Sequence, residues 1–268
     1  MAELWVSVSV LGVAVLLSEV IRRAAAQLSP SAVRIYALEA ASTFQLCCCT
    51  HELKLLGESA RLDLGVALTL TYLMTVVHLH TFREASCNPT AALERLCRGR
   101  SSVKAAAAVI GCQFGAAVAA RHFATFVWSR GLSDVHLRHQ RFGFRCFDPL
   151  GGTLVEAAAV ELCCAFVVQA AALNIHRVEE KLRVHAFAAL ITALVYAGGS
   201  VSGAMFNPVL AYSVQFPCSG HTTFEYVLVY WLAPVAGVAS CVLLLEKIIP
   251  FLSGKSKVEV GRTKLKNQ

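Results

Sequence analysis

The sequence predicts an all-α membrane protein built as an inverted repeat, with three spans and one half-length helix in each half. Three observations predict this fold class. Apolar residues make up 56% of the 268 residues and charged residues only 15%, whereas a soluble domain carries about 25% charged residues. Long apolar segments recur along the whole chain. The dipeptide Asn-Pro occurs twice, at Asn88-Pro89 and Asn207-Pro208, about half the chain length apart.

Apolar segments long enough to span a bilayer, which takes roughly 20 residues, follow one another along the chain. They cover residues 4–21, 34–56, 62–82, 102–128, 153–174, 184–200 and 224–246. The pieces that follow the Asn-Pro pairs, 88–97 and 207–216, are too short to span. The alternative is a large buried helical core in a soluble protein, and the scarcity of charge within the long segments argues against it.

The first segment, residues 4–21, admits three interpretations: a signal-anchor span, a cleaved signal or an interfacial helix. Glu19 and the arginines next to it are typical of a helix end. No small-x-small cleavage site is obvious, so we favour a retained span. The chain then divides into an extra N-terminal hydrophobic segment at 1–30, a main transmembrane domain at 31–250 and a basic tail at 251–268.

Basic residues form four clusters that share one side of the membrane if every long segment crosses. Because Lys and Arg collect in cytosolic loops, this pattern predicts a lumenal N-terminus and a cytosolic C-terminus. The net charge of +7 is therefore attributed to topology and not to nucleic-acid binding. The loop 129–152 disagrees, because it carries four arginines on the predicted lumenal side. The clusters are Arg22, Arg23 and Arg34; Arg83, Arg95, Arg98, Arg100 and Lys104; Arg177, Lys181 and Arg183; and Lys255, Lys257, Arg262, Lys264 and Lys266.

The 11 cysteines lie mostly in apolar stretches, where they behave as small hydrophobic residues. Cys146 and Cys218 fall in the predicted lumenal loops, so they could form a disulfide, and the sequence does not decide this. Cys47 and His51 lie one helical turn apart and could face a metal. No second pair with a matching spacing occurs, so we expect core cysteines, no metal site and no cofactor.

A glutamate within an apolar segment precedes each Asn-Pro pair at nearly the same distance. Glu39 and Glu161 are 122 residues apart, and Asn88 and Asn207 are 119 residues apart. Two crossings, 62–82 and 102–128, lie between the two segments that carry the glutamates, so these segments run in opposite directions. This spacing predicts an inverted-topology repeat.

Asn-Pro predicts the start of a helix at both positions, because Asn is a good N-cap and Pro is favoured at the first helical position. A single Asn-Pro is usually a turn signal, but two that open half-length helices indicate broken helices lining a cavity. Helix N-termini carry about half a positive charge each, so two ends that meet at the midplane repel cations and protons. We expect the amide N–H groups to point into the passage and to interrupt proton transfer along water.

This constellation resembles the aquaporin family over about residues 34 to 246. The resemblance rests on "LEAASTF", "GCQFGAAVA", "VELCCAF", "GAMFNP" and "VYWLAPVAG", while "TFQLCCCTHELKLL" and "KLRVHAFAALITALVYAGG" resemble its divergent intracellular subfamily. It implies an aquaporin-like channel domain at 31–250, with the first segment outside it. Asn88 and Asn207 then correspond to the paired pore asparagines, and Glu39 and Glu161 to the buried glutamates that brace the pore loops.

The departures from the family pattern concern selectivity. The family has Asn-Pro-Ala twice, and here the third residues are Thr90 and Val209, whose extra bulk we expect where the half-helices abut. An Arg is usual two residues after the second Pro, where this chain has Leu210. The other filter positions fall on Leu68, Val195 and Ala204, so all four are apolar. The resemblance implies a passive channel for water and small neutral solutes such as glycerol and hydrogen peroxide.

Two other functions are open. Carboxylates at membrane depth are expensive and often functional, so Glu39 and Glu161 could be proton sites of an ion-coupled secondary transporter. An intramembrane enzyme has less support, because no Ser-His-Asp or paired-acid arrangement can be argued. The resemblance also implies a homotetramer within a lipid bilayer. The C-terminal "TKLKNQ" resembles a dilysine retrieval signal, formed by Lys264 and Lys266, and predicts an endoplasmic-reticulum membrane.

Overall fold

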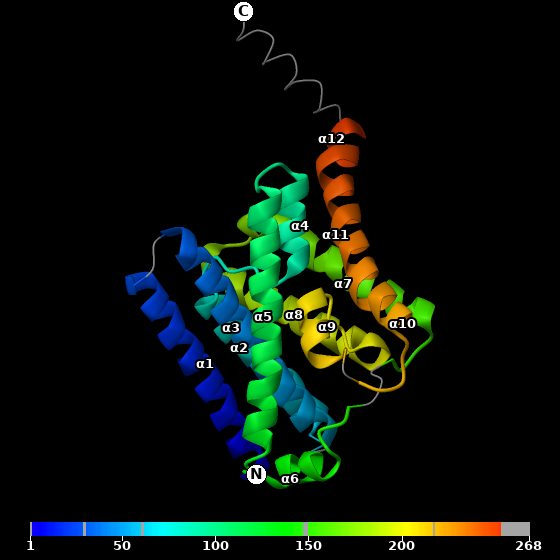
Figure 1. Ribbon diagram of the computed structural model, residues 1–268. Helices are drawn as coiled ribbons and strands as arrows, with labels where there is room; N and C mark the ends of the chain where they lie inside the picture. The colour runs from blue at the N-terminus through cyan, green and yellow to red at the C-terminus, as the bar shows by residue number, and fades with distance from the viewer. Residues whose placement is uncertain (1, 29–30, 60–61, 147–149, 217, 253–268) are drawn as a thin grey trace, which may run out of the picture.

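The computed structural model describes residues 2–28, 31–59, 62–146, 150–216 and 218–252, and the regular elements within them are helices. The all-α fold class is therefore confirmed. Long helices occur at every predicted apolar segment, and the start of α1 lies at the bottom of Figure 1 while α12 lies at the top. The long helices are α1 (Ala2–Leu28), α2 (Ser31–Ser59), α3 (Leu64–Thr81), α5 (Val103–Trp128), α7 (Leu154–Asn174), α8 (Glu180–Ser202) and the segment α10–α12.

The segment α10–α12 is one helix from Thr223 to Leu252 that contains two widened turns. It comprises α10 (Thr223–Val227), η2 (Leu228–Leu232), α11 (Ala233–Leu243), η3 (Leu244–Ile248) and α12 (Ile249–Leu252), and both η elements are π-helical. Each π-helical turn ends two residues before a proline, Pro234 or Pro250. Because proline lacks the N–H of the regular ladder, the turn before it widens without interrupting the helix.

Shorter helices lie between the long ones: α4 (Pro89–Cys97), α6 (Asp134–Arg141), η1 (Ile175–Arg177) and α9 (Pro208–Val214). The sequence predicted a loop at 129–152, so α6 is a finding of the structure. The Ser133 hydroxyl accepts from the His136 N–H at its first turn, Asp134 lies at that end, and basic residues lie in its last turn. The hydroxyl satisfies an N–H group that has no partner within the helix, and the charges at each end are opposite in sign to the helix dipole there.

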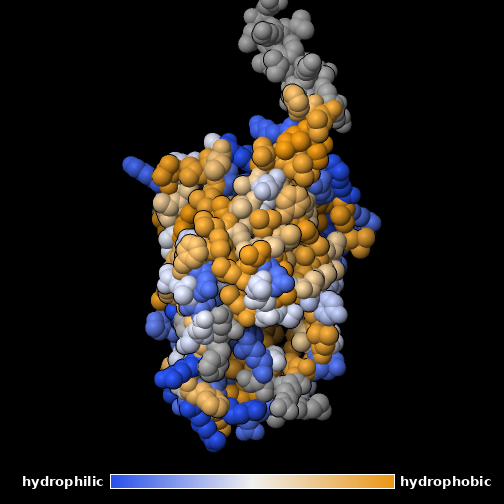
Figure 2. Space-filling view, turned by 90° about the vertical axis from the view of Figure 1, so that its right-hand side faces the viewer, coloured by the Kyte–Doolittle hydropathy of each residue, from blue (hydrophilic) through white to orange (hydrophobic). Residues whose placement is uncertain are grey.

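Six helices among the described residues are long and apolar enough to cross a membrane, so the chain is a multi-pass integral membrane protein. Figure 2 shows the side that carries α10–α12, where a broad apolar band lies above a more hydrophilic lower end. The six are Glu3–Gln27, Leu64–Thr81, Val103–Trp128, Leu154–Arg177, Glu180–Ser202 and Thr223–Leu252. α2 is absent from this set because of its polar residues, although its 29 residues make it about 44 Å long at about 1.5 Å per residue.

The two halves pack in corresponding ways. α2 packs against α5 and α3, and α7 packs against α11 and α8 in the same manner. α3 also packs against α8, which joins the halves, while α4 and α9 contact each other between them. The fold is therefore an inverted repeat, as predicted, with α1 as the additional helix.

α1 packs along α2, with its buried residues recurring every three or four positions. They are mostly small or polar, which lets membrane helices approach closely: Ser7, Leu11, Ala14, Ser18, Arg22 and Ala25. Large apolar side chains such as Trp5 and Leu16 cover the exposed face. α1 is thus a full-length helix with a specific partner within this fold.

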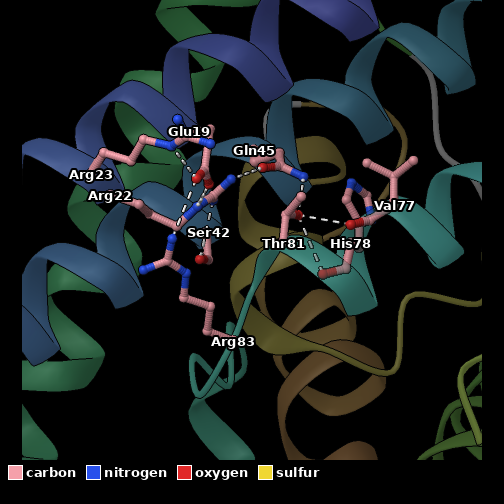
Figure 3. A network of polar contacts seen from close by, with 9 residues as sticks. All are labelled: Glu19, Arg22, Arg23, Ser42, Gln45, Val77, His78, Thr81 and Arg83. Atoms are coloured by element: carbon pink, nitrogen blue, oxygen red, sulfur yellow. Dashed lines mark hydrogen bonds and ion pairs between the residues drawn. The ribbon is translucent and has the colours of Figure 1, made fainter. Parts of the chain in front are cut away.

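Arg22 follows the predicted segment 4–21 in the sequence, but in the structure it lies within α1. α1 continues to Leu28, and the Arg22 side chain is fully buried between α1 and α2 (Figure 3). Its guanidinium donates to Glu19 at 3.0 Å and to the Gln45 side-chain oxygen at 2.8 Å. Gln45 donates in turn to the Thr81 hydroxyl at 3.0 Å, so the network joins α1, α2 and α3.

A second buried network lies at the other end of α2, around Glu52. Its carboxylate accepts from the Ser7 hydroxyl at 2.5 Å and from the Trp128 indole N–H at 2.8 Å, and it pairs with the His136 ring at 3.1 Å. These partners come from α1, α5 and α6. α1 is therefore tied to the main domain by polar contacts near both of its ends.

Candidate functional site

The two half-helices begin at the Asn-Pro pairs and meet at their N-terminal ends. The Asn88 side-chain oxygen accepts from the Thr90 N–H at 3.0 Å, and the Asn207 oxygen accepts from the Val209 N–H at 3.1 Å. Asn88 and Asn207 are therefore the N-caps of α4 and α9, and Pro89 and Pro208 occupy the first helical positions. This arrangement brings two positive helix ends together.

Each asparagine also binds the loop of the opposite half. The Asn88 amide nitrogen donates to the Phe206 carbonyl at 3.3 Å, and the Asn207 amide nitrogen donates to the Cys87 carbonyl at 2.7 Å. The expectation that the amide N–H groups simply point into the passage is therefore incomplete, since one N–H of each crosses to the other loop. An amide nitrogen has two donors, which leaves one per asparagine for a permeating molecule.

The residue before each asparagine has a left-handed backbone, with φ of 52° at Cys87 and 33° at Phe206. Ala204 in the second loop also has a positive φ, of 47°. Such conformations cost about 1–3 kcal/mol each and persist only where the surroundings hold them. They turn the Cys87 and Phe206 carbonyls toward the opposite asparagines, so the strain belongs to the site.

Buried glutamates hold these strained loops. Glu161 accepts from the Ser202 hydroxyl at 2.6 Å, from the Met205 N–H at 2.9 Å and from the Phe206 N–H. Glu39 accepts from the Cys87 N–H at 2.6 Å and from the Ser86 N–H and hydroxyl. Each carboxylate therefore satisfies consecutive loop N–H groups that would otherwise be unpaired inside the protein.

Gln113 on α5 belongs to the same network, and sequence reasoning missed it. Its side-chain N–H groups donate to Glu39 at 2.7 Å and to the Ser86 hydroxyl at 3.3 Å, and the side chain is fully buried. The available signal was a lone amide within the apolar stretch "GCQFG". A buried amide in such a stretch needs a polar partner.

The third residues of the two motifs point in different directions. Val209 is fully buried and packs in the cluster formed by α1, α2 and α5. The Thr90 hydroxyl donates to the Asn88 oxygen at 2.9 Å, and Thr90 also lines a cavity beside α11. The effect of the extra bulk of Thr90 and Val209 on the packing of α4 against α9 stays a prediction.

The four positions assigned to a filter come from different elements. Leu68 lies on α3 and Val195 on α8, both half-buried, while Ala204 is buried in the second loop. Leu210 lies in the first turn of α9, where it packs against two core clusters. All four remain apolar positions.

Arg121 is a further residue that the sequence analysis did not single out. Its guanidinium donates to the Tyr212 and Ser213 carbonyls at the end of α9 and lies over the Tyr212 ring, 5.2 Å from its centroid. A cation at this position satisfies carbonyls of the last turn and complements the negative end of the half-helix. It therefore holds α9 against α5.

Other predicted residues lie away from the asparagines. Cys146 and Cys218 form a disulfide with 4.6 Å between their Cα atoms, which ties the segment after α6 to the segment after α9. His51 contacts the Ser213 hydroxyl at 3.0 Å. Within the described ranges, no three His, Cys, Asp or Glu side chains are placed to hold a metal. Lys264 and Lys266 lie outside the described residues.

Comparison with known proteins finds relatives of similar length. Aquaporin-11 of Homo sapiens is 38% identical over 226 residues, which cover 84% of this chain and 83% of that protein. Aquaporin-11 of Equus caballus is 39% identical, and the matched residues cover 84% of this chain and 82% of that protein. Aquaporin-12 of Mus musculus is 34% identical, with 99% of this chain and 96% of that protein covered. No protein-family model matches the chain.

Proposed function

This chain belongs to the aquaporin family of membrane channels, and we propose that it passively conducts water and small neutral solutes such as glycerol and hydrogen peroxide. The observation that carries the proposal is the crossed pair of asparagines. Asn88 and Asn207 cap facing half-helices, bind the opposite loops and keep one amide N–H each for a permeating oxygen. Two positive helix ends at this point disfavour cations and protons.

The choice of solutes rests on the apolar filter positions. Leu210 stands where a fixed cation would bind and orient permeants, and Leu68, Val195 and Ala204 offer no side-chain donor. An apolar constriction gates by dewetting, which slows water. It admits solutes that carry their own hydroxyl groups, so glycerol and hydrogen peroxide fit it better than ions do.

The test is transport by the purified full chain in liposomes, with water, glycerol and peroxide entry measured by stopped flow. We expect fluxes of all three above those of empty vesicles. Leu210→Arg should reduce glycerol flux, because a long cation narrows and charges the constriction. Fluxes equal to those of empty vesicles would contradict the proposal, and an unchanged glycerol flux in the variant would remove Leu210 from the passage.

The alternative, an ion-coupled transporter with Glu39 and Glu161 as proton sites, has less support. Both carboxylates accept hydrogen bonds from consecutive loop N–H groups, so binding a proton would disrupt the loops that carry the asparagines. Solute uptake should therefore be independent of an imposed pH gradient. Uptake that follows the gradient would favour the transporter.

We further propose a homotetramer in the endoplasmic-reticulum membrane, with the chain divided at 1–30, 31–250 and 251–268. Support comes from the basic clusters, which predict a cytosolic C-terminus, and from the dilysine pattern of Lys264 and Lys266. Replacing both lysines by Ser should shift the protein toward the cell surface. Cross-linking in native membranes should give a tetramer, and retention of the double variant would leave the lysines without this role.

A further inference from the structure

A groove lies between the half-helix α4 and the α11–η3 segment, away from the filter positions. Its volume is about 560 Å³, within the range of about 300–1,000 Å³ of ligand pockets. Its apolar lining consists of Leu93 from α4 and of Val235, Val238, Ala239, Val242 and Leu243 from α11. Thr90 lines the inner end of the groove, the end nearest to Asn88.

Charged residues gather at the outer end of the groove. Arg98 pairs with Glu94 and with Glu246, each at 2.7 Å, so one cation binds both carboxylates. Arg100 and Lys247 also line this end, and both are exposed. Neither forms an ion pair with another residue that the structure describes, so the outer end offers positive charge to a ligand.

The groove has the length of one leaflet. Val235 and Lys247 are separated by about three helical turns, which corresponds to about 18 Å along the helix. The hydrocarbon core of a bilayer is about 30 Å thick, so half of it is about 15 Å. The groove is therefore long enough for an acyl chain of one leaflet, with Arg100 and Lys247 at the end where the headgroup would lie.

We propose that this groove binds one anionic phospholipid of the leaflet at the α12 end. The phosphate and the anionic headgroup contact Arg100 and Lys247, and an acyl chain lies along Val238 and Ala239. A zwitterionic lipid would cover the apolar lining with an acyl chain but would not neutralise both cations. A soluble anion would satisfy the cations but leave the apolar lining open, so the two parts of the groove together select an anionic lipid.

Thr90 connects the inner end of the groove to the pore. Its N–H and its hydroxyl both donate to the Asn88 side-chain oxygen, at 3.0 Å and 2.9 Å. A chain end in the groove packs beside Thr90 and so supports the cap of α4. The lipid is thereby a structural ligand of the half-helix that carries the first asparagine.

The test measures lipid retention by native mass spectrometry on the purified, delipidated full chain. Phosphatidylserine should be retained several-fold better than phosphatidylcholine. R100Q/K247Q should lose this several-fold preference, because it removes both cations that form no ion pair at this end of the groove. R141Q/R145Q removes the same charge from exposed arginines at the other end and should behave as wild type. A239W, which fills the groove, should lower retention of both lipids.

Cys97 provides an independent readout, because this exposed free thiol lines the groove. Phosphatidylserine should slow maleimide labelling of Cys97 but not of Cys163, the exposed free cysteine of α7. Glycerophosphoserine, which lacks acyl chains, should not displace the lipid. Unchanged preference in R100Q/K247Q, full retention in A239W, or displacement by glycerophosphoserine would each overturn the proposal.

Discussion

The two bracing glutamates should respond differently to Gln. At Glu161 the hydrogen bonds are divided between the oxygens, since Oε1 accepts from Ser202 and Met205 and Oε2 accepts from Phe206. At Glu39, Oε1 accepts all the bonds, and Oε2 only shares the Ser86 N–H at 3.1 Å. In Glu39→Gln the side-chain oxygen can take the place of Oε1, which accepts nearly all the hydrogen bonds. In Glu161→Gln one of the two accepting oxygens becomes an NH₂ group, which then faces a backbone N–H and cannot accept from it.

The expected difference in stability between the two variants follows from the number of hydrogen bonds that each one loses. Both substitutions remove one buried charge, and this loss largely cancels when the two variants are compared. Glu161→Gln additionally leaves one buried loop N–H unpaired, which costs about 1–3 kcal/mol. For a domain of this size the extra loss lowers the melting temperature by about 2–12 °C, at about 2–4 °C per kcal/mol.

The assay is thermal unfolding of purified variants, followed by tryptophan fluorescence, together with water permeability per protein. Glu161→Gln should melt below Glu39→Gln and lose more permeability, because the unpaired N–H belongs to the loop beside Asn207. Glu58→Gln is the control, as that side chain is 62% exposed and should change stability by no more than about 0.5 kcal/mol. Equal melting temperatures, or a reversed order, would refute the reasoning from divided hydrogen bonds.

Three further predictions follow from the contacts described above. Asn207→Asp keeps a good N-cap but loses the donor to the Cys87 carbonyl, so proton or cation leak should appear in dye-loaded liposomes, and a tight membrane would count against the pore assignment. Cys218→Ser should cost about 4 kcal/mol of stability, as estimated for a bridge across 72 residues, and reduction of wild type should reproduce the loss. Arg22→Ala should cost about 3–5 kcal/mol by leaving buried partners unpaired, while Arg23→Ala, at a side chain 73% exposed, should change the melting temperature little.

The fold could be predicted from the sequence because the signals behind it are periodic or repeated. The apolar lengths indicated the spans, and the Asn-Pro pairs predicted where α4 and α9 begin. The helix α6 was missed because its apolar content is low, and its formation depends on a cap at Ser133 and on charges suited to its ends. Local chemistry of this kind is weaker than a long apolar pattern.

The site was predicted only in part, because its remaining contacts join distant segments. The crossed bond from Asn207 to the Cys87 carbonyl spans 120 residues, and no local pattern indicates it. The left-handed backbone at Cys87 and Phe206 was also unforeseen, since neither is a glycine. Gln113 and Arg121 gave a visible signal as polar residues in an apolar helix, but their partners became clear only in three dimensions.

The polarity of α2 explains why α1 packs where it does. α2 is the long helix that lacks a sufficiently apolar window, because it directs Glu39 toward the first pore loop and also carries Gln45 and Glu52. In lipid such side chains need partners within the protein. Arg22 binds Gln45 near one end of α1, and Ser7 binds Glu52 near the other. The additional helix therefore shields the polar side of α2 from lipid, and its apolar outer face takes over the lipid contact that α2 cannot make.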